Sequence, residues 1–448
     1  MKNICFVSNY KKTFFFEAIA AELKKEGVTI YWIVLNRMLY DFLLQQGYDR
    51  SQLLLINKDY RNIPSAPVGE YKLNELVWSD RALKYYSWSY DYLVNIQKPL
   101  LDFVKRNAIS HIFGETTYAH EVLITRILKD PGHELNCIYL NPMTTRIPTD
   151  RFIFLADEFQ STIYDKINSG AIEPLPELSP ARPLESIKVQ KLVNQSLKPA
   201  SKIRRIGRFF SLANLQKDDP SISPTDFFAR LKKGITEEMN RITYFFIRTE
   251  NASVTEGKDF VIYTLHKQPE ASIDVVGRYY DDQYANIFNI WRFIPADWYI
   301  VVKEHNNAIG DRGYGFFRKL KKMKNLILLN ENEDSHELIK KSRAVFSVSG
   351  SIAYEAALYG KPAFLFSPVF FSIHPKCIKI GLDDFRDKES IYDLLKKAAD
   401  KKELFNFKEY IYNKSFLGLI SDPLTNPDCM LPENINIVAK AFLIIIHS

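Results

Sequence analysis

Three absences limit the classes of protein to which this chain of 448 residues can belong. It has only four cysteines, Cys5, Cys137, Cys377 and Cys429, and their scattered positions show no metal-ligand spacing. No apolar run approaches the roughly 18–20 residues of a membrane-spanning helix. A predicted strand at 4–8 follows the first residues at once and leaves no room for a signal peptide. We therefore expect a reduced, cytoplasmic protein without a transmembrane segment.

The composition also excludes a disordered chain. Hydrophobic residues make up 46% of the sequence and charged residues 25%, which is typical of a globular protein. No repeat and no low-complexity segment is recognisable. Because 448 residues exceed what one hydrophobic core accommodates, we expect two domains.

Positive charge is concentrated in one segment. The formal net charge is +7, and between Glu185 and Asp218 there are eight Lys or Arg residues and no acid. Apolar residues interleave with these cations at roughly helical spacing from Ile203 to Leu212. The segment 188–217 therefore suits the surface of an anionic membrane or an acidic polymer. A solvated helix face is the alternative, and nucleic acid is not expected because no nucleic-acid-binding module is recognisable.

Strands and helices alternate in two series, which is typical of βαβ units with a parallel sheet. Gly27 and Gly47 stand where the first two helices are expected to stop. In the first series we expect strands at 4–8, 28–35, 53–56, 111–114 and 136–139, with helices at 13–26, 37–46, 73–107 and 119–129. In the second series we expect strands at 260–264, 298–302, 326–329, 344–348 and 363–366, with helices at 280–292, 316–322, 335–341 and 352–358.

Polar residues gather in the loops that follow strands of the second series. The carboxyl ends of parallel strands line one edge of a sheet, and open α/β sheets bind their ligands there. Cations and imidazoles at this edge can stabilise the negative charge that grows on a phosphate leaving group. Any single histidine would also fit a structural hydrogen-bonding role. The candidates in these loops are His266, Lys267, Glu270, Lys303 and His305.

The segment 344–368 is the most informative stretch of the chain. It predicts a buried strand, a Ser-Gly-Ser turn, a short helix and a second buried strand. The turn places backbone N–H groups and the hydroxyls of Ser349 and Ser351 at a helix N-terminus, where an anion such as phosphate is favoured. Gly350 lets the backbone approach a ligand, and Glu355 lies one helical turn further, within reach of a sugar hydroxyl. A capped helix without a ligand is the alternative.

The first half of the chain offers a candidate base and a candidate anion-binding residue. Glu115 directly follows the predicted strand at 111–114, and a carboxylate at such a position suits a base that deprotonates an acceptor hydroxyl. Glu115 can alternatively cap the helix that starts near Ala119. Arg146 lies in the predicted loop 141–148, where it can hold a carboxylate by a bidentate contact.

Four segments of the second half resemble bacterial GT-B glycosyltransferases, most of all those of capsule and lipopolysaccharide assembly. The resemblance is good over about 258–368 and loose in the first half. It implies an α/β fold of the GT-B kind, with two Rossmann-like domains and a cleft between them. The matching segments are Thr264-Leu-His-Lys-Gln-Pro-Glu, Tyr299-Ile-Val-Val-Lys-Glu-His, Ser347-Val-Ser-Gly-Ser-Ile-Ala-Tyr-Glu-Ala and Gly360-Lys-Pro.

The resemblance also implies where a nucleotide-sugar binds. It places phosphate contacts at Ser349, Gly350 and Ser351 and a ribose contact at Glu355, and it implies that no metal or other cofactor is required. We expect Glu115 to be the base, with Glu270 as the second choice, and His266 and Lys303 to stabilise the leaving phosphate. The remaining candidates are substrate-binding residues: His305 for the nucleotide, and Arg146 and Lys267 for the acceptor or a carboxylate.

Three regions follow from this interpretation. Residues 1–250 form an acceptor domain with a helical excursion at 184–250, and residues 251–390 form the nucleotide-sugar domain. Residues 391–448 form a helical segment that can pack back on the N-terminal domain. The expected partners are a nucleotide-sugar donor, a glycan or lipid-linked acceptor, and the inner face of the cytoplasmic membrane.

The sequence departs from the family pattern at one position, and two alternatives to a glycosyltransferase stay open. Asn306 follows His305, where families that use CMP-activated Kdo or sialic acid have proline, so a CMP-sugar is disfavoured. UDP-N-acetylglucosamine 2-epimerases resemble the same loops, but Lys267 stands where they have arginine. A non-catalytic component that binds glycan within an assembly complex is the third reading.

Overall fold

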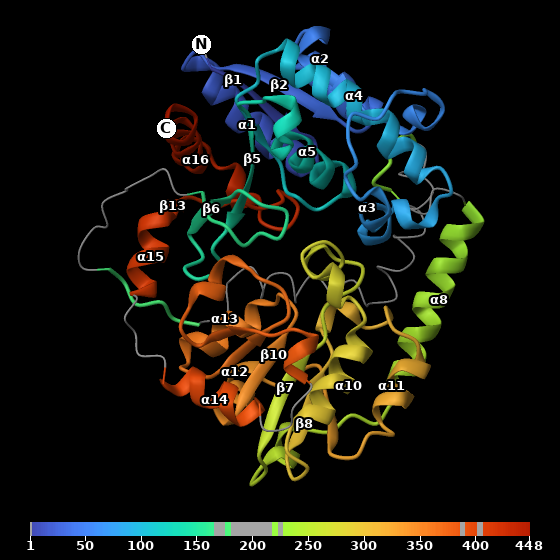
Figure 1. Cartoon of the computed structure of the whole chain (residues 1–448), viewed down its shortest axis with the longest axis vertical. Coiled ribbons are helices and arrows are strands. Elements are labelled where there is room, and N and C mark those ends of the chain that lie inside the picture. Colours follow the sequence, from blue (N-terminus) through green and yellow to red (C-terminus); the bar gives the residue numbers. More distant parts are fainter. Residues whose placement is uncertain (1, 165–174, 181–216, 223–226, 386–389, 401–405) are drawn as a thin grey trace. The chain divides into compact units, whose positions relative to one another are not determined.

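The computed structural model describes residues 2–164, 175–180, 217–222, 227–385, 390–400 and 406–448. The basic segment 188–217 lies outside the described residues except for Lys217. The chain divides into two compact units, whose elements are labelled in Figure 1. The first unit contains residues 1–176, 181–225 and 408–448, and the second contains residues 177–180 and 226–407.

This division differs from the expected regions within the helical excursion. Helix α8 (Phe227–Phe245) lies in the second unit, where the Asn240 amide donates to the Gly310 carbonyl oxygen at 3.1 Å. Helix α16 (Pro432–His447) lies in the first unit. The excursion expected at 184–250 is therefore shared between the two units.

The first unit is built on a mixed sheet of seven strands. They are β1 (Asn3–Val7), β2 (Thr29–Val34), β3 (Leu53–Leu55), β4 (His111–Phe113), β5 (Ile138–Thr144), β6 (Arg151–Leu155) and β13 (Phe416–Leu417). The order is β13-β6-β5-β4-β1-β2-β3, and the strands from β5 to β3 are parallel. Residues 141–144, expected as a loop, instead extend β5, because they pair with the antiparallel β6.

The second unit is built on a parallel sheet of six strands. They are β7 (Phe260–Thr264), β8 (Tyr299–Lys303), β9 (Leu326–Leu329), β10 (Ala344–Ser347), β11 (Ala363–Leu365) and β12 (Cys377–Lys379). The order is β12-β11-β10-β7-β8-β9, which is the strand order of a Rossmann fold. The prediction of two Rossmann-like sheets is therefore confirmed.

Both sheets reverse their strand order beside the first strand of the series. In the first unit β1 lies between β2 and β4, and in the second unit β7 lies between β8 and β10. Open α/β sheets bind ligands outside the carboxyl ends of the strands at such a switch point. The loops after β1 and β4, and those after β7 and β10, are therefore where each unit presents side chains to a ligand.

Aromatic rings fill the core of the first unit, and α16 supplies part of it. The ring of Phe442 in α16 lies 4.6 Å from that of Phe113, 5.0 Å from that of Phe154 and 5.9 Å from that of Phe6. All four side chains are buried. Helix α16 also packs beside α1 (Lys12–Lys25) (Figure 1). Helix α16, from the last part of the sequence, therefore completes the hydrophobic core that the strands of the first part form.

The remaining helices surround the two sheets. In the first unit they are α2 (Arg37–Gln45), α3 (Leu73–Ser79), α4 (Ser89–Arg106), α5 (Ala119–Lys129) and α15 (Phe407–Lys414). In the second unit they are α9 (Ala271–Asp274), α10 (Gln283–Phe293), α11 (Tyr314–Leu320), α12 (Ser335–Lys341), α13 (Ser351–Leu358) and α14 (Ser390–Asp400). Gly27 and Gly47 follow α1 and α2 with φ of 79° and 82°, as expected for helix stops. Among the described residues, no helix combines the length and the apolarity needed to cross a membrane.

Candidate functional site

Hydrogen bonds join the loops after β7 and β10 at the switch point of the second unit. The Nε2 atom of the buried His266 lies 3.1 Å from the Ser347 hydroxyl and 3.3 Å from the backbone nitrogen of Val348. The Gly350 N–H donates to the Ser347 hydroxyl at 3.0 Å. The sequence therefore placed His266 and the Ser-Gly-Ser turn at the same edge correctly, and the structure brings them into contact.

The backbone at Gly350 is tightly enclosed on one side. A Cβ atom there would lie 2.7 Å from the Ser347 hydroxyl oxygen and 3.1 Å from Cε1 of His266, so any other residue displaces this junction. Because the Gly350 N–H already has an acceptor, it is not one of the donors that the turn offers to a ligand. The amides of Ser351 and Ile352, the first two of α13, donate to no described backbone carbonyl.

The two serines of the turn make different contacts. The Ser349 hydroxyl donates to the Ser272 carbonyl oxygen at 2.5 Å, which ties the turn to α9. The Ser351 hydroxyl lies 3.4 Å from Oε1 of Glu355, on the helix face where the sequence predicted this carboxylate. The other oxygen of Glu355 lies 3.6 Å from Nε2 of His336 in α12, a residue that sequence reasoning missed.

The loop after β8 contributes two charged groups with different partners. Lys303 donates to the Ser335 hydroxyl at the start of α12, at 3.0 Å. Glu304 is 1% exposed and accepts two bonds from Arg312, at 2.7 and 2.9 Å. Arg312 also donates to the His266 carbonyl oxygen, so this ion pair fixes the backbone beside the candidate imidazole.

Burial raises the pKa of Glu304 to about 7, and Arg312 opposes the shift. The pKa of His305 is lowered, chiefly by desolvation, whereas the nearby Glu270 acts to raise it. Neighbouring cations lower the pKa of His305 further; they are Lys267, Lys303 and Arg312. His305 is therefore a neutral imidazole at pH 7, surrounded by cations that suit a phosphate.

Lys267 and Glu270 lie at the outer part of this cluster. The Lys267 ammonium forms no hydrogen bond with a described residue, and its charge acts on both His305 and Asp311. Glu270 is exposed, precedes α9 and accepts a hydrogen bond from the Ser272 hydroxyl at 3.1 Å. All the candidates of the second unit therefore lie along one sheet edge: Lys303 ends β8, Ser351 and Glu355 lie in α13, and the others lie in the loops.

The switch point of the first unit holds a different set of charges. The Glu115 carboxylate, after β4, accepts from the Asn9 amide in the loop after β1 and from the ammonium of Lys12, the first residue of α1. Glu115 therefore does not cap α5. That role falls to Asp80, which accepts from the Ala119 N–H at 2.8 Å.

A buried glutamate shapes the loop that carries Glu115. Glu121 is 0% exposed and accepts from the N–H groups of Glu115 and Thr117, each at 2.8 Å. Tyr139 donates to the same carboxylate at 2.9 Å. Between the two anchored amides, Thr116 adopts a φ of 52°, which non-glycine residues rarely do. The chain therefore holds the Glu115 carboxylate at a fixed place on the sheet edge.

The charge of Glu115 acts on Arg81, and both Arg81 and His120 contact the ring of Tyr118. The Arg81 guanidinium lies 4.5 Å from the ring centroid of Tyr118, and its buried Nε has no hydrogen-bond partner among the described residues. The Nε2 atom of the buried His120 also has none, and burial lowers the pKa of His120 to about 4. Arg146, which sequence reasoning did select, is exposed after β5 with a φ of 65°.

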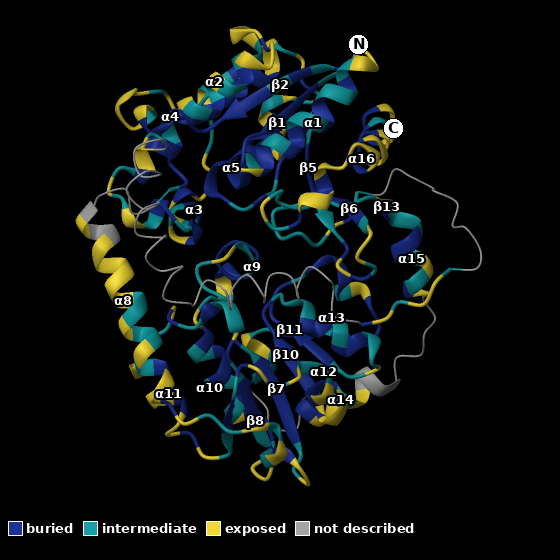
Figure 2. Cartoon of the chain, turned by 180° about the vertical axis from the view of Figure 1, so that it is seen from behind, coloured by how far each residue is buried: buried dark blue, intermediate teal, exposed yellow. Residues whose placement is uncertain are grey.

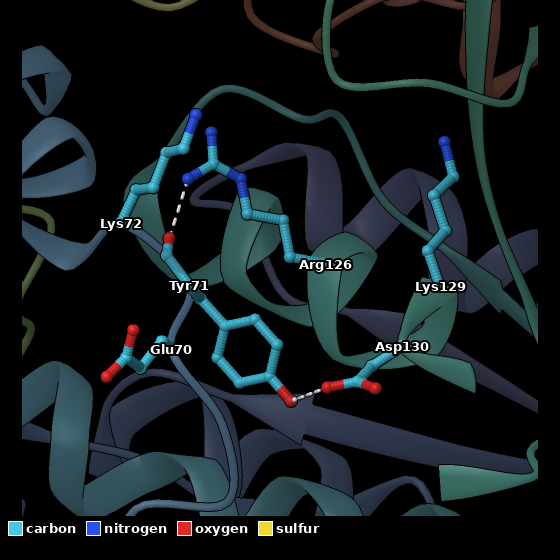
Figure 3. Close-up of a pocket in the computed structure, with 6 residues that line it drawn as sticks. All are labelled: Glu70, Tyr71, Lys72, Arg126, Lys129 and Asp130. Carbon is cyan, nitrogen blue, oxygen red and sulfur yellow. Dashed lines mark hydrogen bonds between the residues drawn. The ribbon is translucent and has the colours of Figure 1, made fainter. Parts of the chain in front are cut away.

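A polar hollow lies elsewhere in the first unit, at the start of α3 and the end of α5 (Figure 3). Its volume is about 310 Å³, and its lining mixes cations with the carboxylates of Glu70 and Asp130; the cations are Lys72, Arg126 and Lys129. Arg126 forms ion pairs with Glu75 at 2.7 Å and Glu158 at 3.0 Å. The partly buried cation of this hollow is therefore neutralised within the protein.

No group of three or more His, Cys, Asp or Glu residues in the described part of the chain is arranged to hold a metal ion. The candidate roles of the selected residues stay predictions. What the geometry establishes is their grouping: a phosphate-compatible cluster in the second unit, and a carboxylate held by a lysine in the first.

Comparison with known proteins gives structural likeness only. No family model matches the chain, and no curated protein sequence does. Among solved structures, a beta Kdo 2,7 transferase, KpsC of Thermosulfurimonas dismutans, is 9% identical with a TM-score of 0.39, and the match covers 93% of each chain.

Two other solved structures are similar over nearly the whole length. The UDP-GlcNAc 2-epimerase of Methanocaldococcus jannaschii is 13% identical with a TM-score of 0.27, covering 92% of this chain and 97% of the other. The calicheamicin glycosyltransferase CalG4 is 11% identical with a TM-score of 0.26, covering 99% and 97%. Because the identities and TM-scores are low, we base the function on the residues of the two switch points.

Proposed function

We propose that this protein is a glycosyltransferase that moves a sugar from a nucleotide-sugar to a growing surface glycan. The observation that carries the proposal is the junction at the second switch point, where His266, Ser347 and Gly350 form one hydrogen-bonded unit at the N-terminus of α13. In a sheet with the Rossmann strand order, this is where nucleotides bind.

The residues around this junction suit the diphosphate of the donor. The amides of Ser351 and Ile352 lie at the positive end of the dipole of α13, and the ammonium groups of Lys303 and Lys267 lie in the adjacent loops. Negative charge grows on the phosphate oxygen as its bond to the sugar breaks, so fixed cations there lower the barrier. Since lysine supplies this charge, we propose that transfer needs no metal, and activity should persist with a chelator present.

The carboxylate of the first unit suits the acceptor. Glu115 would take the proton of an acceptor hydroxyl as that oxygen bonds to the anomeric carbon and the nucleotide leaves. Lys12 pairs with this carboxylate and fixes its position. Arg146 and Arg81 add positive charge on the same sheet edge, which favours an acceptor that carries carboxylate or phosphate groups.

The resemblance over 258–368 supports a capsule or lipopolysaccharide glycan as acceptor, made at the inner face of the cytoplasmic membrane. The basic segment 188–217 supports that location through its sequence alone. We propose a nucleotide-sugar donor without choosing its base, because no described contact selects one, although Asn306 after His305 disfavours CMP.

A thermal-shift panel of CMP, UDP, GDP, CDP and TDP tests the donor site. A nucleotide at about 100 times its Kd raises the free energy of unfolding by about 2.7 kcal/mol, a clear shift. Gly350→Ala should remove that shift, because its Cβ would lie 2.7 Å from the Ser347 hydroxyl. Gly315→Ala is the matched control, since a Cβ at Gly315 meets nothing within 4 Å.

Turnover then distinguishes the transferase from its alternatives. We expect nucleotide release from the donor only when a glycan acceptor is present. Conversion of a UDP-sugar without any acceptor would instead establish an epimerase. Tight glycan binding without turnover of any donor would establish a binding component, and a nucleotide shift that survives in Gly350→Ala would refute the donor site.

A further inference from the structure

Helix α8 carries a row of large apolar side chains that stay exposed. They recur at spacings of three and four residues, so they lie on one side of the helix. Figure 2 shows much of α8 in the colour of exposed residues. We call this set the α8 row: Phe228, Leu231, Ile235, Met239 and Ile242, continued by Phe246 just after the helix, with exposed fractions from 45% to 81%.

The opposite side of α8 is fixed to its own unit. The Asn240 amide donates to the Gly310 carbonyl oxygen at 3.1 Å, and the hydroxyl of Tyr244 donates to Glu331 at 2.9 Å. Tyr244 is buried and packs on Phe317 with ring centroids 5.2 Å apart. The rotation of α8 is therefore set by packing, and the α8 row is the side that the second unit leaves uncovered.

An apolar row of this size is unusual on a water-exposed surface. Single exposed apolar residues are ordinary, whereas contiguous apolar patches mark surfaces that contact a partner or a membrane. The row extends along the whole helix, so a small ligand does not account for it. It requires an apolar partner that is itself extended.

The charges beside the α8 row indicate which partner this is. Lys232 and Lys233 are exposed on α8, and the Arg248 side chain is 85% exposed just after it. Of the two acids on α8, Glu238 is neutralised by Arg241 at 2.6 Å. The segment 188–217, which precedes α8 in the sequence, has eight Lys or Arg residues and no acid. Apolar residues combined with excess cations are the signature of a helix that lies on an anionic membrane.

We propose that α8 docks the second unit on an anionic membrane surface. The helix lies in the plane of the membrane, with the α8 row at the boundary of headgroups and acyl chains and the lysines beside lipid phosphates. This goes beyond the proposed function, which rests a membrane location on the segment 188–217 alone, because it assigns the second unit its own membrane contact. It does not depend on which sugar is transferred.

Flotation of the full chain with vesicles tests the proposal. Vesicles of phosphatidylcholine and phosphatidylglycerol in equal parts should carry the protein, and vesicles of phosphatidylcholine alone should not. The triple variant Ile235→Ser, Met239→Ser, Ile242→Ser should lower binding by about tenfold or more. The matched control is Leu382→Ser with Leu424→Ser, which removes apolar side chains 65% and 69% exposed elsewhere and should bind as the unchanged protein does.

Three results would overturn the proposal. Equal flotation of the triple variant and the unchanged protein would exclude the α8 row as the contact. A lower midpoint of thermal unfolding in the triple variant, without vesicle binding by the unchanged protein, would mean that another part of the chain covers the row. A dimer in light scattering that the triple variant dissociates, again without vesicle binding, would mean that a second copy covers it.

Discussion

Replacing Glu115 with glutamine separates its two possible contributions, to catalysis and to the first unit's stability. The substitution keeps the shape of the side chain and removes its charge. The Lys12 ammonium, which pairs with Glu115, has no other ion-pair partner among the described residues. Glu115→Gln therefore leaves a cation in a partly buried place without an anion.

The size of the stability loss follows from the burial of the pair. Removing one partner of a fully buried ion pair costs about 3–5 kcal/mol. Here the side chains of Lys12 and Glu115 are 11% and 22% exposed, so solvent replaces part of the lost interaction. We expect the free energy of unfolding to fall by about 1–3 kcal/mol. The double variant Lys12→Met, Glu115→Gln removes the unpaired cation and should recover most of that loss.

Turnover should respond differently. Loss of a general base lowers the rate by about 10²- to 10⁴-fold, and a methionine at position 12 cannot restore a proton acceptor. The assay is nucleotide release with acceptor present, measured at a temperature where every variant is folded, alongside hydrogen exchange in peptides from β1 and β4. The reasoning is refuted if the double variant regains turnover together with stability, because Glu115 would then be structural.

Three other changes have expected outcomes. Phe442→Ala should lower the free energy of unfolding of the first unit by about 3–5 kcal/mol in urea titrations, whereas Ile444→Ala, at a side chain 48% exposed, should change it little. Arg126→Ala should destabilise the same unit by up to about 3–5 kcal/mol, because Glu75 and Glu158 lose their cation. Lys129→Ala, at an exposed side chain nearby, should change the stability little, and equal effects of the two variants would contradict the prediction. Burial raises the pKa of Glu304 to about 7 from 4.5, so its contribution to stability is present below pH 4.5 and is lost as pH rises through 7. Between pH 4.5 and 7 the free energy of unfolding should therefore fall by up to about 3 kcal/mol less in Glu304→Gln than in the unchanged protein. Parallel curves of the two proteins would exclude Glu304 as the titrating group.

The sequence predicted the parallel strands of both sheets except β12, because strands and helices alternate locally, whereas β12 has only three residues. The strand at 260–264 and the helices at 119–129 and 335–341 begin and end where the structure has them. It did not reveal β6, whose antiparallel pairing with β5 involves no intervening helix. It predicted that the segment 391–448 can pack back on the N-terminal domain, but not which residues of α16 enter that core, because those contacts join opposite ends of the sequence.

In the candidate site, too, some contacts could be predicted from the sequence and others could not. His266 and the Ser-Gly-Ser turn were predicted together because strand topology alone brings their loops to one edge. The pairs Lys12–Glu115, Glu304–Arg312 and His336–Glu355 were missed, because side-chain pairing depends on register and rotamer rather than on pattern. One signal was present for Glu304: it continues a buried strand, where a carboxylate requires a cation.

The position of α16 in the first core has a consequence for how the protein is made. Residues 4–155 of the first sheet leave the ribosome early, but Phe442, which covers Phe113 and Phe154, follows Leu155 by 287 residues. At about 5–20 residues per second, that interval lasts about 15–60 s. The second unit is nearly continuous in sequence, from 226 to 407, and can fold within the same interval.

Until α16 has been synthesised, part of the aromatic face of the first sheet therefore stays exposed, while the second unit can already fold. Exposed aromatic surface on an incomplete sheet is what chaperones recognise and what aggregates form from. The order of synthesis makes the first unit, which carries Glu115, the last part of the protein to become native.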